Sequence, residues 1–448
     1  MTAVLPERAR PSAPGATPAG AWVRNGRAGG RHAGRTAPGD RTLAARHVPG
    51  LLVVCVIAFD TQWATSATNR YGAAAALLAI LVSCRAPRLV PPDLLAAATG
   101  AWACVTLLWA ADVDTAVRMA YLYGAACAMF IAVRHVVHSR AAFFAVGYAC
   151  LAGCVATSVK LIADPLSNST RARDSMMDFS VRYGVEGVNS NYTAYSLAAG
   201  VALAAVLMLL RPSTKVERLC IVAAAGVLFW GVLLTSTRGA LIGILAGAAF
   251  LLLSAMSWRL ARTVAVVGVP LVLVAVPLGL YRVLASETLW LDGAFAGRAT
   301  GDLSGRLYIW PYALSSWFDS PLLGIGPGMF TATGRLGVGA HDLLLSLGND
   351  LGLVGICLYA GMLAYAFAGP FRHSPACSRL AGAFLVSQAP IWLTGHWEVS
   401  PVCFVILALV SVAPVALPPA GGGRSTAPRH AAAPPGPVGA REHALGRP

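Results

Sequence analysis

Charged side chains are scarce in this sequence, and acidic ones are scarcer than basic ones. Only 12% of the 448 residues are Asp, Glu, Lys or Arg, about half the fraction expected of a soluble protein. Hydrophobic residues make up 57% of the chain and occur in long continuous runs instead of amphipathic stripes. This composition excludes an ordinary soluble domain and predicts that lipid surrounds most of the chain.

Cysteine motifs and nucleic-acid-binding motifs are also missing. The ten cysteines form no C-x-x-C pattern and lie in or beside apolar runs, which argues against a disulfide framework and a zinc or iron–sulfur site. The net charge of +15 comes from basic residues in the tails and between the apolar runs. We expect these residues to face the cytoplasm and anionic lipid, and we expect no nucleic-acid partner.

Both ends of the chain lack the apolar side chains that a core requires. Residues 1–47 are rich in Arg, Ala, Gly and Pro, and residues 418–448 have a similarly simple composition. We expect both tails to be disordered. No short apolar core with a cleavage site directly follows the first tail, so a cleaved signal peptide is not expected.

Residues 48–417 contain the apolar runs. We count twelve runs with lengths near the ~20 residues that cross hydrocarbon as a helix. Backbone groups in lipid must bond internally, so the predicted fold is an all-α polytopic membrane protein with about twelve transmembrane helices. Their approximate limits are 49–66, 71–84, 94–111, 115–133, 141–162, 190–210, 219–236, 239–256, 263–281, 344–368, 380–394 and 400–417.

The distribution of basic residues predicts the orientation of these helices. Every second connection carries at least two basic residues, whereas the turns at 111–114 and 395–398 are acidic. The positive-inside rule therefore places both tails in the cytoplasm. The basic connections are 85–88, 134–140, 211–218, 257–262 and 371–379.

Two of the predicted outer connections are longer than turns, at about 163–188 and 282–343. The middle of the larger one has apolar and aromatic residues near helical spacing. We expect a helix lying at the outer interface, with Trp310, Tyr312 and Trp317 at the level of the lipid headgroups.

Three arginines are predicted at outer membrane boundaries. Arg238 stands in L-T-S-T-R-G-A-L between two runs, Arg306 lies in the larger outer segment, and Arg182 precedes Asn191 at the start of a run. Arg238 could instead snorkel to the interface, and Arg306 could be a solvated loop arginine. Converging on one cavity, they would suit a pyrophosphate, because guanidinium groups bind phosphate oxygens in pairs.

The same outer segments contain a histidine and several carboxylates. His341 precedes an apolar run that includes Asp350, and histidine titrates near neutrality, which suits a general base for a sugar hydroxyl. An interfacial histidine without a task is the alternative. The pair Asp112 and Asp114 could hold a divalent metal, but the charge bias of outer turns also predicts two acids there. We assign no metal ligands and leave that pair open.

Five short pieces of the chain, which occur in the same order as in the family, resemble the O-antigen ligase / O-antigen polymerase family of bacterial membrane glycosyltransferases. The resemblance covers roughly residues 50–415. The family often has Asn after the histidine and Glu before L-G, where this chain has Asp342 and Asp350. The pieces are R-Y-G…N-S-N at 182–191, T-S-T-R-G-A at 235–240, G-R…W at 305–310, P-L-L-G-I-G-P-G-M-F at 321–330 and H-D…N-D-L-G-L-V-G at 341–355.

The resemblance implies a reaction at the outer face of the bacterial cytoplasmic membrane. A glycan would pass from undecaprenyl pyrophosphate to an acceptor hydroxyl with inversion, without metal or cofactor. By position, Arg238 and Arg306 would hold the pyrophosphate, with Arg182 a weaker candidate. His341 would orient or deprotonate the acceptor, and Asp350 and Asn191 would support the site.

Other functions remain open at this level. A polymerase of the same family differs little in these motifs, and twelve spans would also fit a transporter or flippase in polysaccharide export. Charged residues within the runs are few, namely Asp60, Arg118 and Lys160, and no internal repeat is evident, which argues against transport. A non-catalytic scaffold is a third possibility. The donor sugar and the acceptor, whether glycan, lipid or polymer, are not specified.

Overall fold

The structure is a computed structural model, and it leaves both tails and much of the two long outer segments outside the described residues. The predictions of disordered tails therefore remain predictions. The description covers residues 47–61, 67–83, 89–163, 169–171, 181–185, 189–210, 214–280, 306–395 and 397–417.

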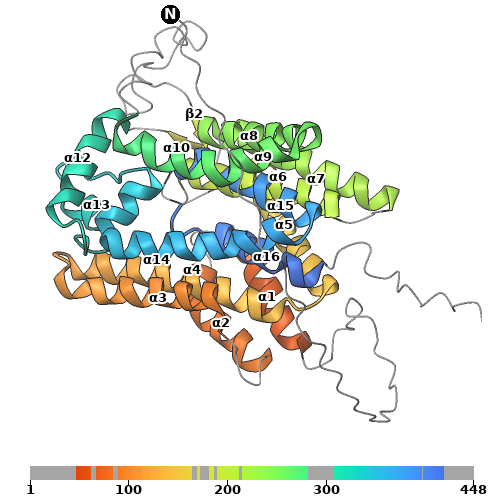
Figure 1. Cartoon of the computed structure of the whole chain (residues 1–448), viewed down its shortest axis with the longest axis horizontal. Helices are drawn as coiled ribbons and strands as arrows, with labels where there is room; N and C mark the ends of the chain where they lie inside the picture. Colours follow the sequence, from red (N-terminus) through yellow and green to blue (C-terminus); the bar gives the residue numbers. More distant parts are fainter. Residues whose placement is uncertain are drawn as a thin grey trace, which may run out of the picture. The chain divides into compact units, whose positions relative to one another are not determined.

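The described part of the chain is almost entirely helical (Figure 1), as the apolar runs predict. The exception is a pair of three-residue antiparallel strands, β1 (Ser169–Arg171) and β2 (Val181–Tyr183). The helical elements are α1 (Val48–Asp60), α2 (Ala67–Ser83), α3 (Pro91–Val105), η2 (Thr106–Trp109), α4 (Val113–Val136), α5 (Arg140–Ala163), α6 (Ser190–Leu210), α7 (Lys215–Thr235), α8 (Arg238–Met256), α9 (Trp258–Thr263), η3 (Val264–Gly268), α10 (Val269–Ala275), η4 (Val276–Leu280), α12 (Arg306–Asp319), α13 (Met329–Thr333), α14 (Leu343–His373), α15 (Pro375–Trp392) and α16 (Pro401–Ala416).

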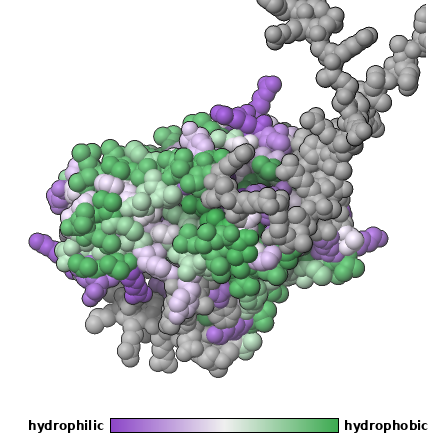
Figure 2. All heavy atoms as spheres, turned by 90° about the horizontal axis from the view of Figure 1, so that it is seen from below, coloured by the Kyte–Doolittle hydropathy of each residue, from purple (hydrophilic) through white to green (hydrophobic). Residues whose placement is uncertain are grey.

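Eight helical segments of the described chain are long and apolar enough to cross a membrane. Each of the twelve predicted runs coincides with a helix, but α1, α2 and α16 are shorter and α15 does not meet the same criterion, so the count of twelve spans stays a prediction. Large apolar side chains are exposed on the surface, among them Leu108 at 84% and Met256 at 85%. Apolar residues also cover much of the face in Figure 2, which fits a lipid environment.

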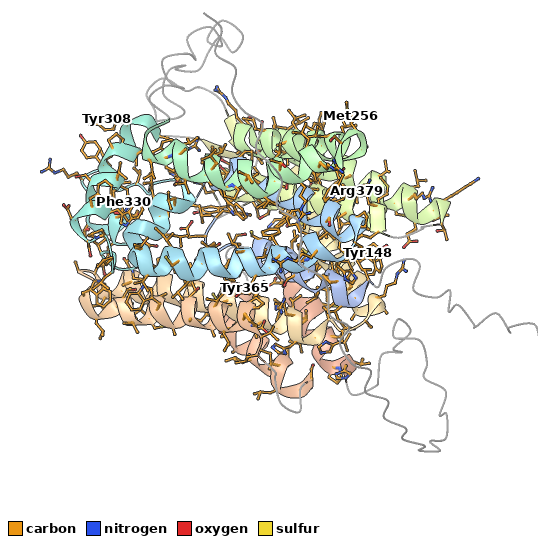
Figure 3. The ribbon with its side chains drawn as sticks, in the orientation of Figure 1. Tyr148, Met256, Tyr308, Phe330, Tyr365 and Arg379 are labelled. Atoms are coloured by element: carbon orange, nitrogen blue, oxygen red, sulfur yellow. The ribbon has the colours of Figure 1, made fainter. Side chains whose placement is uncertain are left out.

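The described connections between the helices lie at two ends of the molecule. We call the end with the described inner connections the basic end, and the end with the described outer connections the site end (Figure 1, Figure 3). In Figure 3, Tyr308 and Phe330 lie toward the site end, and Tyr148 and Arg379 toward the basic end. Which end faces the cytoplasm remains a prediction. The basic end comprises residues 89–93, 134–140, 214–218 and 371–379 (Figure 3). The site end comprises residues 109–115, 189–195, 235–239, 306–350, 392–395 and 397–400.

α14 is broken in its first half, and the turn at residues 321–326 packs against the break. Gly352 has a φ of +64°, so the helix is interrupted there. The amides of Leu353 and Val354 donate to the carbonyls of Pro321 and Leu322, at 2.9 and 3.2 Å. Gly324 has a φ of +73°, and a Cβ there would lie 2.6 Å from the nitrogen of Gly352. Glycines at 324 and 352 therefore allow the P-L-L-G-I-G turn to dock on the broken helix.

The helix predicted inside the larger outer segment is present as α12, although its position at a membrane interface is untested. One part of that prediction is wrong. Trp310 is only 2% exposed, and its Nε1 donates to the carbonyl of Ala340 at 3.0 Å, so it lies inside the protein. Tyr312 is exposed, as expected of an interfacial side chain.

Candidate active site

Arg306 is the first residue of α12, and its half-buried side chain lies at the site end. Its Nη2 donates to the carbonyl oxygen of Thr394 at 2.7 Å. Burial lowers the pKa of Arg306, while nearby Tyr195 and Asp342 act in the opposite direction. A guanidinium placed where water is scarce interacts strongly with any anion that enters, since the local dielectric is low.

Thr394 lies in the turn that follows α15, and it connects three separate segments of the chain. Besides Arg306, its carbonyl accepts a hydrogen bond from the hydroxyl of Tyr195 at 2.8 Å. Its own hydroxyl donates to the carbonyl of Pro390 at 2.6 Å. Gly239 packs directly against the side chain of Thr394 and leaves no room for a Cβ. The turn thus brings the T-S-T-R-G segment and Arg306 to one place.

Arg238 is the first residue of α8, and its side chain is exposed. The preceding residues form a sharp turn, in which Ser236 has a φ of +53° and ends α7. The hydroxyl of Thr237 donates to Oδ1 of Asn191 at 3.3 Å and makes no capping bond to α8. Asn191, predicted as a supporting residue, therefore lies beside the segment that carries Arg238.

His341 has a φ of +52°, in the left-handed region that residues other than glycine rarely adopt. Within the described residues, only His341 and Ser236 combine a side chain with such a φ. Both neighbours of His341 are fixed, because Ala340 accepts from Trp310 and the Asp342 carboxylate caps α14 through the amide of Leu345 at 2.9 Å. Backbone strain of this kind is concentrated at functional sites.

The carboxylate of Asp350 connects separate segments of the chain by hydrogen bonds. Its Oδ2 accepts from the hydroxyl of Tyr123 at 3.1 Å, and its Oδ1 accepts from the amide of Gly328 at 2.9 Å. The carboxylate therefore ties the G-I-G-P-G turn to α4 and α14. A cavity of about 30 Å³ adjoins it. The polar side chains that line this cavity are those of Thr331, Ser346, Asp350 and Glu398.

Two other predicted groups have different outcomes. Arg182 lies in β2 opposite Thr170, but the placement of its side chain is outside the described residues, so its role stays a prediction. Asp112 caps α4, with Oδ2 accepting from the hydroxyl of Thr115 at 2.8 Å. Within the described part of the chain, no three His, Cys, Asp or Glu residues come together as metal ligands.

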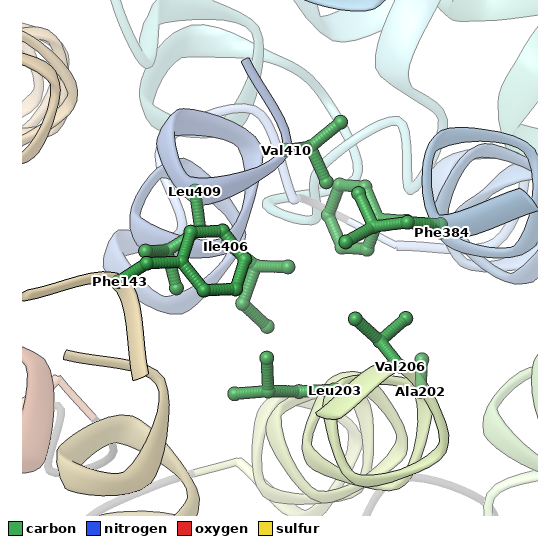
Figure 4. Close-up of a pocket in the computed structure, with 9 residues that line it drawn as sticks. Phe143, Ala202, Leu203, Val206, Phe384, Ile406, Leu409 and Val410 are labelled. Atoms are coloured by element: carbon green, nitrogen blue, oxygen red, sulfur yellow. The ribbon is translucent and has the colours of Figure 1, made fainter. Parts of the chain in front are cut away.

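Sequence reasoning missed Thr394 and Tyr195. Both are uncharged and lie outside the quoted motifs, and their bond joins positions 199 residues apart. A second cavity, of about 10 Å³, lies among α5, α6, α15 and α16 and has only apolar residues in its lining (Figure 4). It contains no group that could take part in catalysis.

The chain was compared with known proteins. A family model described as O-antigen ligase matches residues 223–360. The matched range contains Arg238, Arg306, His341 and Asp350. No curated protein matches the chain. The family match confirms the resemblance to the O-antigen ligase family, and the apolar helices agree with a multi-pass membrane protein.

Proposed function

We propose that this protein, whose residues 223–360 match the O-antigen ligase family model, is a glycosyltransferase. It would move a glycan from undecaprenyl pyrophosphate to an acceptor hydroxyl with inversion. The reaction would take place at the outer face of the bacterial cytoplasmic membrane, with both termini in the cytoplasm. The acceptor is a glycan, lipid or polymer with a free hydroxyl group.

The observation that carries this proposal is the convergence of separate motifs on the turn at Thr394. Arg306 bonds the carbonyl of Thr394, and Gly239, next to Arg238, packs on its side chain. One turn of α12 beyond Arg306, Trp310 holds the residue before His341. These contacts support two arginines and one histidine acting in the same site.

The two arginines suit a pyrophosphate leaving group. Arg238 stands at the N-terminus of α8, where the helix dipole disfavours a cation but favours a bound phosphate. The amides of that terminus and the guanidinium of Arg238 would bind phosphate oxygens together. Arg306, half-buried at the same end, would stabilise the negative charge that grows as the glycosyl bond breaks.

His341 would act on the acceptor. The acceptor oxygen attacks the anomeric carbon from the face opposite the pyrophosphate, and the hydroxyl proton passes to the imidazole. The carbon–oxygen bond to pyrophosphate breaks and its electron pair leaves with undecaprenyl pyrophosphate. A single displacement of this kind inverts the anomeric configuration.

The test is glycan transfer by the purified protein in liposomes that contain a lipid-linked glycan and an acceptor. Arg238→Ala, Arg306→Ala and His341→Ala should each abolish transfer, whereas Arg335→Ala, at an exposed arginine of the same end, should not. Full activity in the three site variants would refute the proposal. Movement of the glycan lipid across the bilayer without any product would favour a transporter or flippase instead.

The product distinguishes the two family activities. Longer glycan chains on the lipid carrier would indicate an O-antigen or exopolysaccharide polymerase, and attachment of the finished glycan to a different molecule would indicate a ligase. Donor and acceptor identity would follow from the substrates that the wild-type protein accepts.

A further inference from the structure

We propose that Tyr195 is a positioning residue for the donor pyrophosphate, acting on Arg306 through the carbonyl of Thr394. This inference rests on the proposed role of Arg306 in pyrophosphate binding. No sequence motif points to Tyr195, which lies in the second turn of α6.

The geometry joins three segments at one oxygen atom. The Thr394 carbonyl accepts from Nη2 of Arg306 at 2.7 Å and from the hydroxyl of Tyr195 at 2.8 Å. A carbonyl oxygen has two lone pairs, so both donors can be satisfied together. The tyrosine hydroxyl also lies within 3.3 Å of the Thr394 hydroxyl, so it fixes the direction of the whole turn.

The location of this oxygen favours a cation. Thr394 follows the C-terminus of α15, which ends at Trp392, and helix C-termini carry partial negative charge. The end of α15 therefore provides a neutral acceptor that attracts the guanidinium without neutralising it.

Tyr195 is itself held rigidly. It is 1% exposed, and its ring packs edge-on against Trp397 with 5.4 Å between ring centroids. Nε1 of Trp397 donates to Oε1 of Gln388 at 3.1 Å, which connects the tyrosine to α15. Gly395 leaves no space for a Cβ beside the tyrosine ring. A rigid hydroxyl of this kind sets the orientation of the carbonyl that Arg306 contacts.

Tyr195→Phe removes the hydroxyl and keeps the ring packing. The matched control is Tyr192→Phe, because Tyr192 lies on the same helix and stacks on Trp397 with 6.1 Å between centroids. We measure binding of farnesyl pyrophosphate, a short analogue of the lipid carrier, to the full-length protein in nanodiscs. The Arg306→Ala variant and the Arg306→Ala/Tyr195→Phe double variant complete a double-mutant cycle.

If Tyr195 acts through Arg306, Tyr195→Phe weakens binding about three- to tenfold in the wild-type background. It then has no further effect once Arg306 is alanine, and Tyr192→Phe leaves binding unchanged. Equal losses in both backgrounds, or no loss with Arg306 present, would overturn the inference. Failure of the wild type to bind the pyrophosphate would overturn it as well.

The binding cycle separates this inference from the proposed function. Coupling between Tyr195 and Arg306 without any glycan transfer would uphold the inference and refute the transferase. Glycan transfer by the wild type without coupling between Tyr195 and Arg306 would uphold the transferase and overturn the inference.

Discussion

The two ends of the bundle each hold a partly buried arginine, but with different partners. At the basic end, Nε of Arg134 lies 2.6 Å from a carboxylate oxygen of Asp93, and its Nη1 donates to Ser411. At the site end, Arg306 donates to the neutral carbonyl of Thr394. Asp342 is within electrostatic reach of Arg306, but its Oδ1 caps α14.

The different partners of Arg134 and Arg306 suggest different tasks, namely fold stability for Arg134 and anion binding for Arg306. An arginine paired with a buried carboxylate adds no net charge, and its removal leaves Asp93 with only His135 and the amide of Val90 beside it. Arg306 instead donates to an uncharged acceptor, and nearby Asp342 favours its charged form. Positive φ at residues with side chains follows the same division, because His341 and Ser236 both lie at the site end. Charge pairing thus joins helices at one end, and residues with a strained backbone lie at the other.

The largest expected effect of breaking this pattern is at the basic end. Arg134→Ala leaves Asp93, which is 1% exposed, without its guanidinium. We expect a loss of about 3–5 kcal/mol in stability, measured by thermal unfolding in detergent. Transfer per folded molecule should be unchanged, because the substitution is remote from the site. Arg379→Ala, at an exposed arginine of the same end, should have little effect on unfolding. Reduced transfer at normal stability would mean that the two ends are coupled.

The strained backbone of His341 gives a prediction of intermediate size. His341→Ala and His341→Gly should both be inactive, because both lack the imidazole. Glycine adopts a positive φ freely, so His341→Gly should be the more stable of the two by about 1 kcal/mol. Thermal unfolding of the two variants, side by side, measures the difference. Equal stability would show that the left-handed conformation carries no strain, and residual transfer in either variant would remove the histidine from the mechanism.

The division into two ends could be predicted from the sequence, and the contacts within the site could not. Apolar runs near span length predict helices because lipid leaves the backbone no other partners. Alternating basic and acidic connections predicted the orientation of the helices, and this orientation stays a prediction. The prediction for Trp310 was wrong, because the sequence does not show whether the indole N–H of a tryptophan donates to water or to a buried carbonyl. In the structure it donates to the carbonyl of Ala340.

Motif order predicted Arg238, Arg306 and His341 as candidates, and their roles remain to be tested. The turn at Thr394 had no such signal, because it acts through a backbone carbonyl that every residue type possesses. Asp350 was predicted as a support for the site. Its bonds to Tyr123 and Gly328 show how it could do so, but the spacing from His341 did not reveal either partner.

The smallest expected effect concerns Asp112, for which the sequence left a metal role open. Hydrogen bonds from Thr115 lower the pKa of the Asp112 carboxyl below its usual value of 3.8. A lowered pKa in the folded state means that the ionised cap adds stability above the unfolded pKa, and that this contribution disappears as the pH falls through the folded pKa. Asp112→Ala should therefore lower the unfolding temperature slightly at neutral pH and not at all well below pH 3.8.

The same variant decides between a cap and a metal ligand. A cap predicts that Asp112→Ala transfers glycan at the wild-type rate, with or without a chelator, because the carboxylate only satisfies the first turn of α4. A metal ligand predicts loss of transfer in the variant, and the same loss in the wild type after chelation. Since Asp112 lies at the site end, an unchanged rate would also show that carboxylates at this end can serve the fold alone, as Asp93 does at the basic end.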